Sequence, residues 1–301
     1  MESNLLAEND QTYLELLNSL KFNEHPSKLV QESLKIFVNA MRSILQNYTC
    51  SLTFEELYNL LYNLYMEGCS SILYSILEKL IIFYINQNFT FLINNPSEDE
   101  FLTRIYEFLT KYHKSLNLIK DATLYLRVKY IKPSNCLSLE TISNQYLSKS
   151  FLDNSKFKHR FKNQLRDVFE QYRCNTTLQL IVLKNISEML FALDHTVYSS
   201  LIENSFIEYF QCLYRSIFIS LLCEYKNLTN YIKKIIYHLN KVKKFCKDNL
   251  VARTGSLLND LLIEMALESF SDIQKFDKNG LIDWIENKNF SDIEIFHDLF
   301  C

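Results

Sequence analysis

Apolar residues recur every three or four positions along almost the whole chain, which is the spacing of amphipathic helices. The clearest case runs from Leu52 to Tyr65. Thr53 and Glu56 match the capping box, in which a hydroxyl and a carboxylate three residues apart bind each other's backbone amides at a helix start. The sequence therefore predicts a helix that begins after Thr53. Its core-facing stripe would consist of Leu57, Leu60, Leu61 and Leu64.

A second apolar stripe lies beside the leucines on the same predicted helix, and it consists of Phe54, Tyr58, Tyr62 and Tyr65. Together the two stripes are wider than one packing neighbour requires. Tyrosine is favoured where one end of the side chain is dry and the other is wet, so we interpret the aromatic stripe as a surface offered to another protein. The alternative is that both stripes are buried between two neighbouring helices of the same chain.

The periodicity divides the chain into two groups of helices. The first group is expected at about 11–21, 27–47, 53–67, 70–87, 98–115 and 117–131. A polar stretch, 144–158, separates it from a second group at about 159–174, 176–193, 197–226, 227–248 and 254–272, and two short helices follow at about 280–287 and 291–300. This layout predicts an all-α, elongated helical solenoid, with two bundles of five or six helices joined end to end and the start of a third.

Composition narrows the fold class further. Hydrophobic residues make up 48% of the 301 residues, as in a globular protein, but the chain has only three glycines and three prolines. An average chain of this length would carry about 20 glycines and about 15 prolines. Tight hairpins, phosphate-binding loops and dinucleotide-binding turns need glycine, so the protein classes built on them are nearly excluded.

Charge and hydropathy argue against two kinds of partner. The net charge is −3, so no global basic field would draw the chain to nucleic acid or to an acidic membrane. The longest apolar runs, Ser71–Ile85 and Ser216–Cys223, are short or interrupted by charged residues, so we expect no membrane span.

One basic run stands out, and it comprises Lys233, Lys234, Lys241, Lys243, Lys244 and Lys247. An anion-binding patch would need interleaved aromatic residues or a concentrated face. We expect these lysines to be spread around a helix, where they would form a solvated face. A protein that binds anions through this run is the alternative.

No catalytic or metal-binding pattern is visible. None of the eight cysteines forms a Cys-x-x-Cys pair or has a histidine at zinc spacing, and no His-Glu-x-x-His motif or nucleophile elbow occurs. The adjacent Asp194 and His195 lack a third member of a catalytic triad, and we interpret them as a surface turn. We therefore expect no enzyme, no metal and no cofactor. The start of the chain has no signal peptide, so the expected compartment is the cytoplasm, the nucleus or both.

Four motifs, in order and at the expected spacing, resemble the helical repeats of the cullin family. Residues 53–62, Thr-Phe-Glu-Glu-Leu-Tyr-x-x-x-Tyr, resemble the second helix of the first repeat, most like the type of cullin that binds BTB-domain adaptors. Residues 118–130 resemble the fifth helix, although Arg127 and Val128 stand where the family has Asp-Arg. Tyr231-Ile232-Lys233-Lys234 resembles the second repeat, and residues 280–300 resemble its end and the opening of the third.

The resemblance implies a domain organisation. Residues 1–24 would be an N-terminal extension with the start of the first helix region, 25–135 the first repeat and 136–279 the second. Residues 280–301 would be the start of a third repeat, truncated at Cys301. The domain that recruits the RING subunit would be present only if the chain continued beyond Cys301.

The resemblance also implies a function and a site. In cullins the second and fifth helices of the first repeat bind the substrate adaptor, and the matching positions here are Phe54, Glu55, Tyr58, Tyr62 and Tyr125. The chain would be the non-catalytic scaffold arm of a cullin–RING E3 ubiquitin ligase, with a BTB-domain or related adaptor as its partner. The alternatives are a helical vesicle-tethering protein or other interaction scaffold, and a truncated cullin-like decoy.

Overall fold

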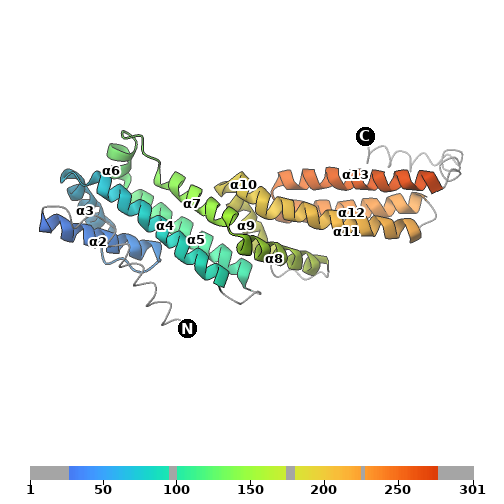
Figure 1. The fold of residues 1–301 in the computed structure, drawn as a ribbon, viewed down its shortest axis with the longest axis horizontal. Helices are drawn as coiled ribbons and strands as arrows, with labels where there is room; N and C mark the ends of the chain where they lie inside the picture. The colour runs from blue at the N-terminus through green and yellow to red at the C-terminus, as the bar shows by residue number, and fades with distance from the viewer. Residues whose placement is uncertain (1–26, 95–99, 174–179, 225–227, 277–301) are drawn as a thin grey trace. The chain divides into compact units, whose positions relative to one another are not determined.

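The computed structural model describes residues 27–94, 100–173, 180–224 and 228–276, and these ranges are helical with no β-strand among them (Figure 1). The predicted all-α class is confirmed. The helices expected at 11–21, 280–287 and 291–300 lie outside the described residues.

The chain divides into two compact units, residues 1–157 and 158–301. Compact units need not coincide with sequence repeats, so the repeat boundary predicted after residue 135 stays a prediction. Unit 1 contains α2 (Lys28–Leu45), α3 (Phe54–Met66), α4 (Ser70–Asn94), α5 (Phe101–Ala122), α6 (Leu124–Leu126), the π-helical segment η2 (Arg127–Ile131) and α7 (Leu139–Asp153). The helix α8 (Ser155–Arg173) begins in the last residues of unit 1 and continues into unit 2. Unit 2 continues with α9 (Leu180–Leu193), α10 (His195–Tyr198), the π-helical segment η3 (Ser199–Glu203), α11 (Asn204–Glu224), α12 (Leu228–Asn249) and α13 (Ala252–Phe276).

The core of unit 1 forms where α2 packs against α3, α4 and α5, and where α4 packs against α7. Its aliphatic centre includes Leu34, Leu73 and Ile105, all without exposed surface. Two buried hydroxyl groups inside it form hydrogen bonds between helices. The Tyr112 hydroxyl lies 2.6 Å from Ser143 Oγ and so joins α5 to α7. Ser115 Oγ donates to the carbonyl of Ile44, 2.8 Å away, and joins α5 to the end of α2.

The helix α4 is longer than the sequence suggested, because it continues to Asn94 instead of ending near residue 87. By length and composition alone it could cross a membrane, which the interrupted apolar run did not lead us to expect. Its buried side chains, among them Ile76 and Ile81, lie inside unit 1, where α4 packs on α2, α5 and α7. A core helix of a bundle passes the same test, so this feature is weak support for a membrane span.

The predicted polar separator at 144–158 is wrong. Those residues belong to α7 and to the start of α8. Within the stretch, Leu147, Ser148 and Phe151 are buried. Its serines and asparagines made it look polar, but Leu147 and Phe151 are four residues apart and belong to the buried face of α7, which packs against α4.

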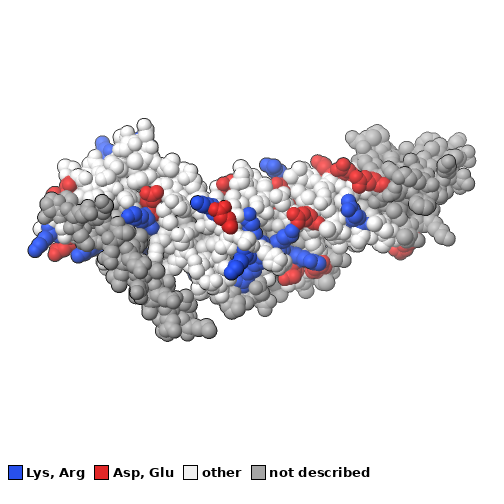
Figure 2. All heavy atoms as spheres, viewed as in Figure 1, with Lys and Arg blue, Asp and Glu red and all other residues white. Residues whose placement is uncertain are grey.

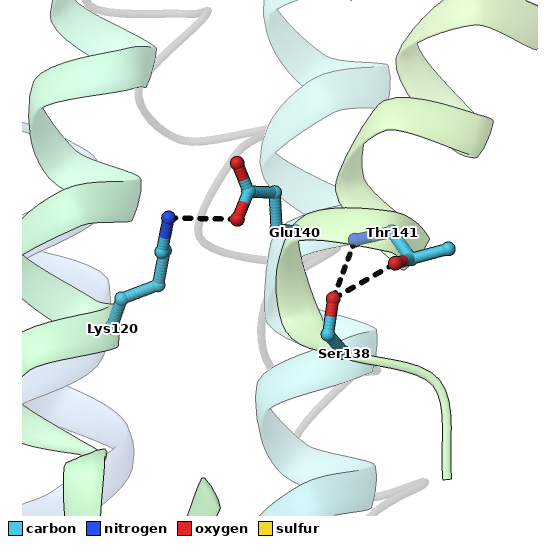
Figure 3. A network of polar contacts seen from close by, with 4 residues as sticks. All are labelled: Lys120, Ser138, Glu140 and Thr141. Atoms are coloured by element: carbon cyan, nitrogen blue, oxygen red, sulfur yellow. Dashed lines mark hydrogen bonds and ion pairs between the residues drawn. The ribbon is translucent and has the colours of Figure 1, made fainter.

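The start of α7 is fixed by polar contacts (Figure 3). Ser138 Oγ accepts a hydrogen bond from the Thr141 amide at 3.0 Å and so caps the helix. Lys120, in the last turn of α5, forms an ion pair with Glu140 in the first turn of α7, with 2.8 Å between Nζ and Oε2. These contacts hold the two ends of the 123–138 segment, which carries one of the predicted site residues.

The core of unit 2 is rich in aromatic rings. Phe169 of α8 lies against Phe206 and Phe210 of α11 and Phe245 of α12, with ring centroids 3.8, 5.5 and 5.2 Å away. A buried polar cluster holds the start of α13. Thr254 Oγ1 lies 2.6 Å from the Tyr198 hydroxyl and donates to Glu203 Oε1 at 3.2 Å.

Candidate partner-binding surface

Local chemistry fixes both ends of α3. Thr53 Oγ1 accepts from the Glu56 amide at 3.2 Å, and Glu56 Oε2 accepts from the Thr53 amide at 2.8 Å, so the predicted capping box is confirmed. The Thr53 amide and then the Thr53 hydroxyl, which donates to Glu56 Oε2 at 2.9 Å, lower the pKa of Glu56. At the other end Gly68 adopts a φ of 76°, and the amides of Gly68 and Cys69 donate to the carbonyls of Tyr65 and Leu64. This is a Schellman motif, which needs a left-handed residue.

The two predicted stripes of α3 have different environments. Leu57, Leu61 and Leu64 are buried, as predicted, and Leu60 is half-buried. The aromatic stripe is not sealed inside unit 1. Phe54 is 58% exposed and Tyr62 is 39% exposed, while Tyr58 and Tyr65 are half-buried and Glu55 is exposed. The alternative in which neighbouring helices of the chain cover both stripes therefore does not describe this helix.

Tyr125 of α6 joins this stripe from a segment distant in sequence. Its ring packs edge-on against Tyr62 at 5.2 Å and against Tyr65 at 4.9 Å between centroids. Desolvation, followed by the neighbouring hydroxyls of Tyr62, Tyr65 and Tyr58, raises the pKa of Tyr125. The structure thus brings three rings into one cluster, with Tyr58 close by. Phe54 and Glu55 share the helix with these rings, although no ring contact joins Phe54 to Tyr125.

The position of Tyr125 depends on a break in the helix after α5. We expected a helix end near residue 115 and a new helix over 117–131, but α5 runs unbroken to Ala122. At Thr123 the backbone leaves helical geometry, with φ −94° and ψ 17°. Its side chain donates to the Ile119 carbonyl at 2.6 Å beside its own amide at 2.9 Å, an arrangement that often bends helices. Beyond the bend, the buried Leu126 and Ile131 anchor one side of the α6–η2 segment. Tyr125 can then face α3, against which α6 packs.

Three exposed apolar residues near these rings were missed by the sequence analysis: Met66, Leu124 and Val128. Met66 ends α3, and Leu124 and Val128 lie four residues apart on either side of Tyr125 in sequence. Their exposed fractions are 64%, 45% and 45%. The signal that could have found Leu124 and Val128 is this spacing of four, which places both on the same side of a helix. We define the docking face as Phe54, Glu55, Tyr58, Tyr62, Tyr65, Met66, Leu124, Tyr125 and Val128.

Basic side chains lie at one side of the docking face. Arg127 is half-buried and Lys129 is exposed in η2. Arg127 occupies a position where the resembling family has an acid. A partner that reached this side would meet positive charge, whereas near the start of α3 it would meet the exposed carboxylate of Glu55. The docking face is therefore mainly apolar, with one exposed acid at the start of α3 and two basic residues soon after Tyr125 in sequence.

The described residues contain no group of three His, Cys, Asp or Glu side chains that could hold a metal ion. Asp194 caps α10 by accepting from the Thr196 amide at 2.7 Å, and the neighbouring His195 is exposed against the Phe191 ring. The pair was expected in a surface turn, but the structure places it at the start of a helix, with Asp194 as the cap and His195 as the first helical residue. Cys50, Cys69, Cys136, Cys212 and Cys246 are free thiols.

The lysine run on α12 differs from our expectation. Instead of being spread around the helix, its lysines lie on the half that faces away from the buried Ile235, Val242 and Phe245. Five of them are exposed and Lys241 is half-buried. The signal that could have shown this is the helical spacing of Ile235, Leu239 and Val242, which marks the arc that the rest of unit 2 covers.

Comparison with known proteins points to one family. A family model described as the cullin alpha solenoid domain matches residues 34–301. Cullin-3B of Arabidopsis thaliana is 21% identical over 277 residues, which cover 91% of this chain and 37% of that protein. Cullin-3 of Dictyostelium discoideum is 22% identical over 277 residues, covering 88% of this chain and 35% of that protein. Cullin-3A of Arabidopsis thaliana is 20% identical over 274 residues, with 91% and 37% covered. The chain spans little more than a third of the length of these relatives.

Proposed function

Because this chain belongs to the cullin family, we propose that it is the adaptor-binding scaffold arm of a cullin–RING ubiquitin ligase. In this proposal it carries no catalytic step and works in the cytoplasm, the nucleus or both. Its task is to hold a substrate adaptor through the docking face of α3 and α6. Recruitment of a RING subunit belongs to the proposal only for a chain that continues beyond Cys301.

The observation that carries the proposal is the exposed aromatic cluster. Phe54 and Tyr62 present large apolar area to solvent, and Tyr125 is held edge-on between Tyr62 and Tyr65. Aromatic side chains bury much surface at a small cost in rotamer entropy, so they dominate the energetics of many protein interfaces. The helix that presents them is fixed at both ends, so little order has to be gained on binding.

A BTB-domain adaptor is the favoured partner. The three curated relatives are all cullin-3 proteins. The resemblance of residues 53–62 is to the BTB-binding type, and Phe54, Tyr58 and Tyr62 occupy its adaptor-binding positions. Arg127 is the departure from that pattern, and it would favour an adaptor that offers an acidic group opposite η2.

Affinity capture with paired variants tests the proposal. The site variant is Phe54→Ala with Tyr62→Ala. The matched control is Phe91→Ala with Tyr146→Ala, because Phe91 and Tyr146 are 48% and 38% exposed on α4 and α7 of the same unit. We expect the unaltered chain and the control to capture BTB-domain proteins from the source cell, and the site variant to lose them. With a purified adaptor, the site variant should bind about 100-fold more weakly, as expected for two central aromatic anchors.

Two outcomes would contradict the proposal. If both variants lose the adaptor equally, the aromatic cluster is not the contact. If coat or tether subunits are captured in place of BTB-domain or F-box adaptors, the helical tether remains as the better account.

A further inference from the structure

The exposed half of α12 combines positive charge with an exposed aromatic ring. Lys233, Tyr237 and Lys241 are spaced by four residues, and Lys244 follows three residues later, so the four lie along one strip of the helix. Tyr237 is 60% exposed. The run from Lys233 to Lys247 is about 21 Å long at the rise of an α-helix. An anion-binding patch needs interleaved aromatic residues or basic side chains concentrated on one face. This strip of α12 has both.

Five of the six lysines are not paired with an acidic side chain of a described residue. No carboxylate of a described residue forms an ion pair with Lys234, Lys241, Lys243, Lys244 or Lys247. Lys234 Nζ instead lies 5.9 Å from the centre of the Tyr237 ring, at cation–π distance. Asp248, at the end of the run, is an exposed acid on the same helix.

The neighbouring helix limits what this face can accept. Of the helices in contact with α12, α13 carries three exposed carboxylates four residues apart: Asp260, Glu264 and Glu268. Figure 2 shows acidic side chains gathered along α13. Packed helices lie about 8 to 10 Å apart, which is close to the Debye length at physiological salt. A broad anionic surface, such as a membrane or a nucleic-acid duplex, would bring its own negative charge near these carboxylates. A narrow ligand laid along α12 would avoid them.

We propose that the outer face of α12 binds an acidic peptide segment of a partner protein. Carboxylates of the segment pair with Lys234, Lys241 and Lys244, and an apolar side chain between them covers the Tyr237 ring. Charge complementarity steers the encounter, and the ring supplies the apolar contact that separate surface ion pairs lack. This site is separate from the docking face, and it does not depend on the function proposed above.

A binding titration of the full chain tests this site. The probe is a fluorescein-labelled peptide of about 15 residues, which matches the length of the run at 1.5 Å per residue, with glutamates throughout and one central phenylalanine. Fluorescence anisotropy should show saturable binding. Replacing Lys234, Lys241 and Lys244 by Glu should weaken it by at least about tenfold, since three attractive pairs become repulsive. Tyr237→Ala should weaken it by about threefold.

The matched control reverses the same number of charges elsewhere, through Lys35→Glu, Lys114→Glu and Lys184→Glu, which replace exposed lysines of α2, α5 and α9. It should bind the peptide like the unaltered chain. A second site variant with Gln at positions 234, 241 and 244, checked by circular dichroism, separates lost binding from lost fold. Equal loss in the control variant, or no binding by the unaltered chain, overturns the proposal. Tighter, α12-dependent binding of an equally charged single-stranded oligonucleotide, or of vesicles rich in phosphatidylserine, overturns the assignment to a protein partner.

Discussion

The exposed faces of α3 and α12 differ in chemistry, although both helices are amphipathic. Each helix buries one side, through Leu61 and Leu64 in α3 and through Val242 and Phe245 in α12. The outer side of α3 has no lysine or arginine and presents aromatic rings, whereas that of α12 presents six lysines around a single exposed tyrosine. Binding at the first should rest on buried apolar area, and binding at the second on charge. We therefore expect the exposed residues of each helix, and not its core stripe, to determine the class of partner that it binds.

The largest expected effect is a difference in the free energy of unfolding between substitutions on the buried side and on the exposed side of α3. Leu64→Ala removes a side chain that is 1% exposed and leaves a cavity, so it should lower the free energy of unfolding by about 2 to 5 kcal/mol. Phe54→Ala, on the outer side, should change it by less than about 0.5 kcal/mol. Urea denaturation followed by circular dichroism measures both. A Phe54 variant as unstable as the Leu64 variant would mean that the ring belongs to the core.

The inner side of α12 should become sensitive to alkaline pH. Burial raises the pKa of the Cys246 thiol to about 12. Below the thiol's ordinary pKa the folded and unfolded chains both keep the proton. As pH rises above about 9, the unfolded chain releases it while the folded chain retains it, and stability falls by about 1.4 kcal/mol per pH unit. The stability advantage of the unaltered chain over Cys246→Ala should therefore shrink between pH 8 and pH 11, as measured by urea denaturation at each pH. A constant difference would contradict this.

Salt should weaken binding at the basic face of α12 much more than binding at the docking face. Raising sodium chloride from about 50 mM to about 500 mM shortens the Debye length from more than 10 Å to less than 5 Å. Peptide binding at α12 should weaken by about tenfold, and adaptor binding at the docking face by less than about threefold. Anisotropy and calorimetry at the two salt concentrations measure these changes. Equal salt dependence at both faces would remove the distinction.

The smallest effect concerns the start of α3. Thr53→Ala removes the hydroxyl that accepts from the Glu56 amide and should cost about 1 kcal/mol. Because the pKa of Glu56 is lowered in the folded chain, its contribution is present above the ordinary glutamate pKa and is lost as pH falls through the folded value. Denaturation of Thr53→Ala and the unaltered chain at pH 7 and pH 3 should show a smaller difference at pH 3. A difference that grows on acidification would contradict this assignment.

Local signals in the sequence predicted α3 well. Its capping box and its leucine stripe depend on residues within three or four positions of one another, and the structure confirms them. The stretch at 144–158 failed because helix formation there depends on burial against α4, which no local pattern reports. Leu147 and Phe151 are buried in that stretch, although Ser148, Lys149 and Ser150 stand between them.

The candidate site was only partly accessible from the sequence. The residue types of the aromatic stripe could be read directly, and resemblance to a family supplied Tyr125. Its packing between Tyr62 and Tyr65 depends on the bend at Thr123, which the expected helix boundary near residue 115 misplaced. The lysines of α12, by contrast, could have been assigned to one half of the helix from the sequence, because the apolar Ile235, Leu239 and Val242 recur at helical spacing and are buried.

Hydroxyl-radical footprinting of the unaltered chain, alone and with a BTB-domain adaptor, tests the central claim most directly. The account predicts that Phe54 and Tyr62 are oxidised readily in the free chain and are protected in the complex. Phe91 and Tyr146, which are similarly exposed on α4 and α7, should be oxidised equally in both states. Slow oxidation of Phe54 and Tyr62 in the free chain, or protection of Phe91 and Tyr146 in their place, would contradict it.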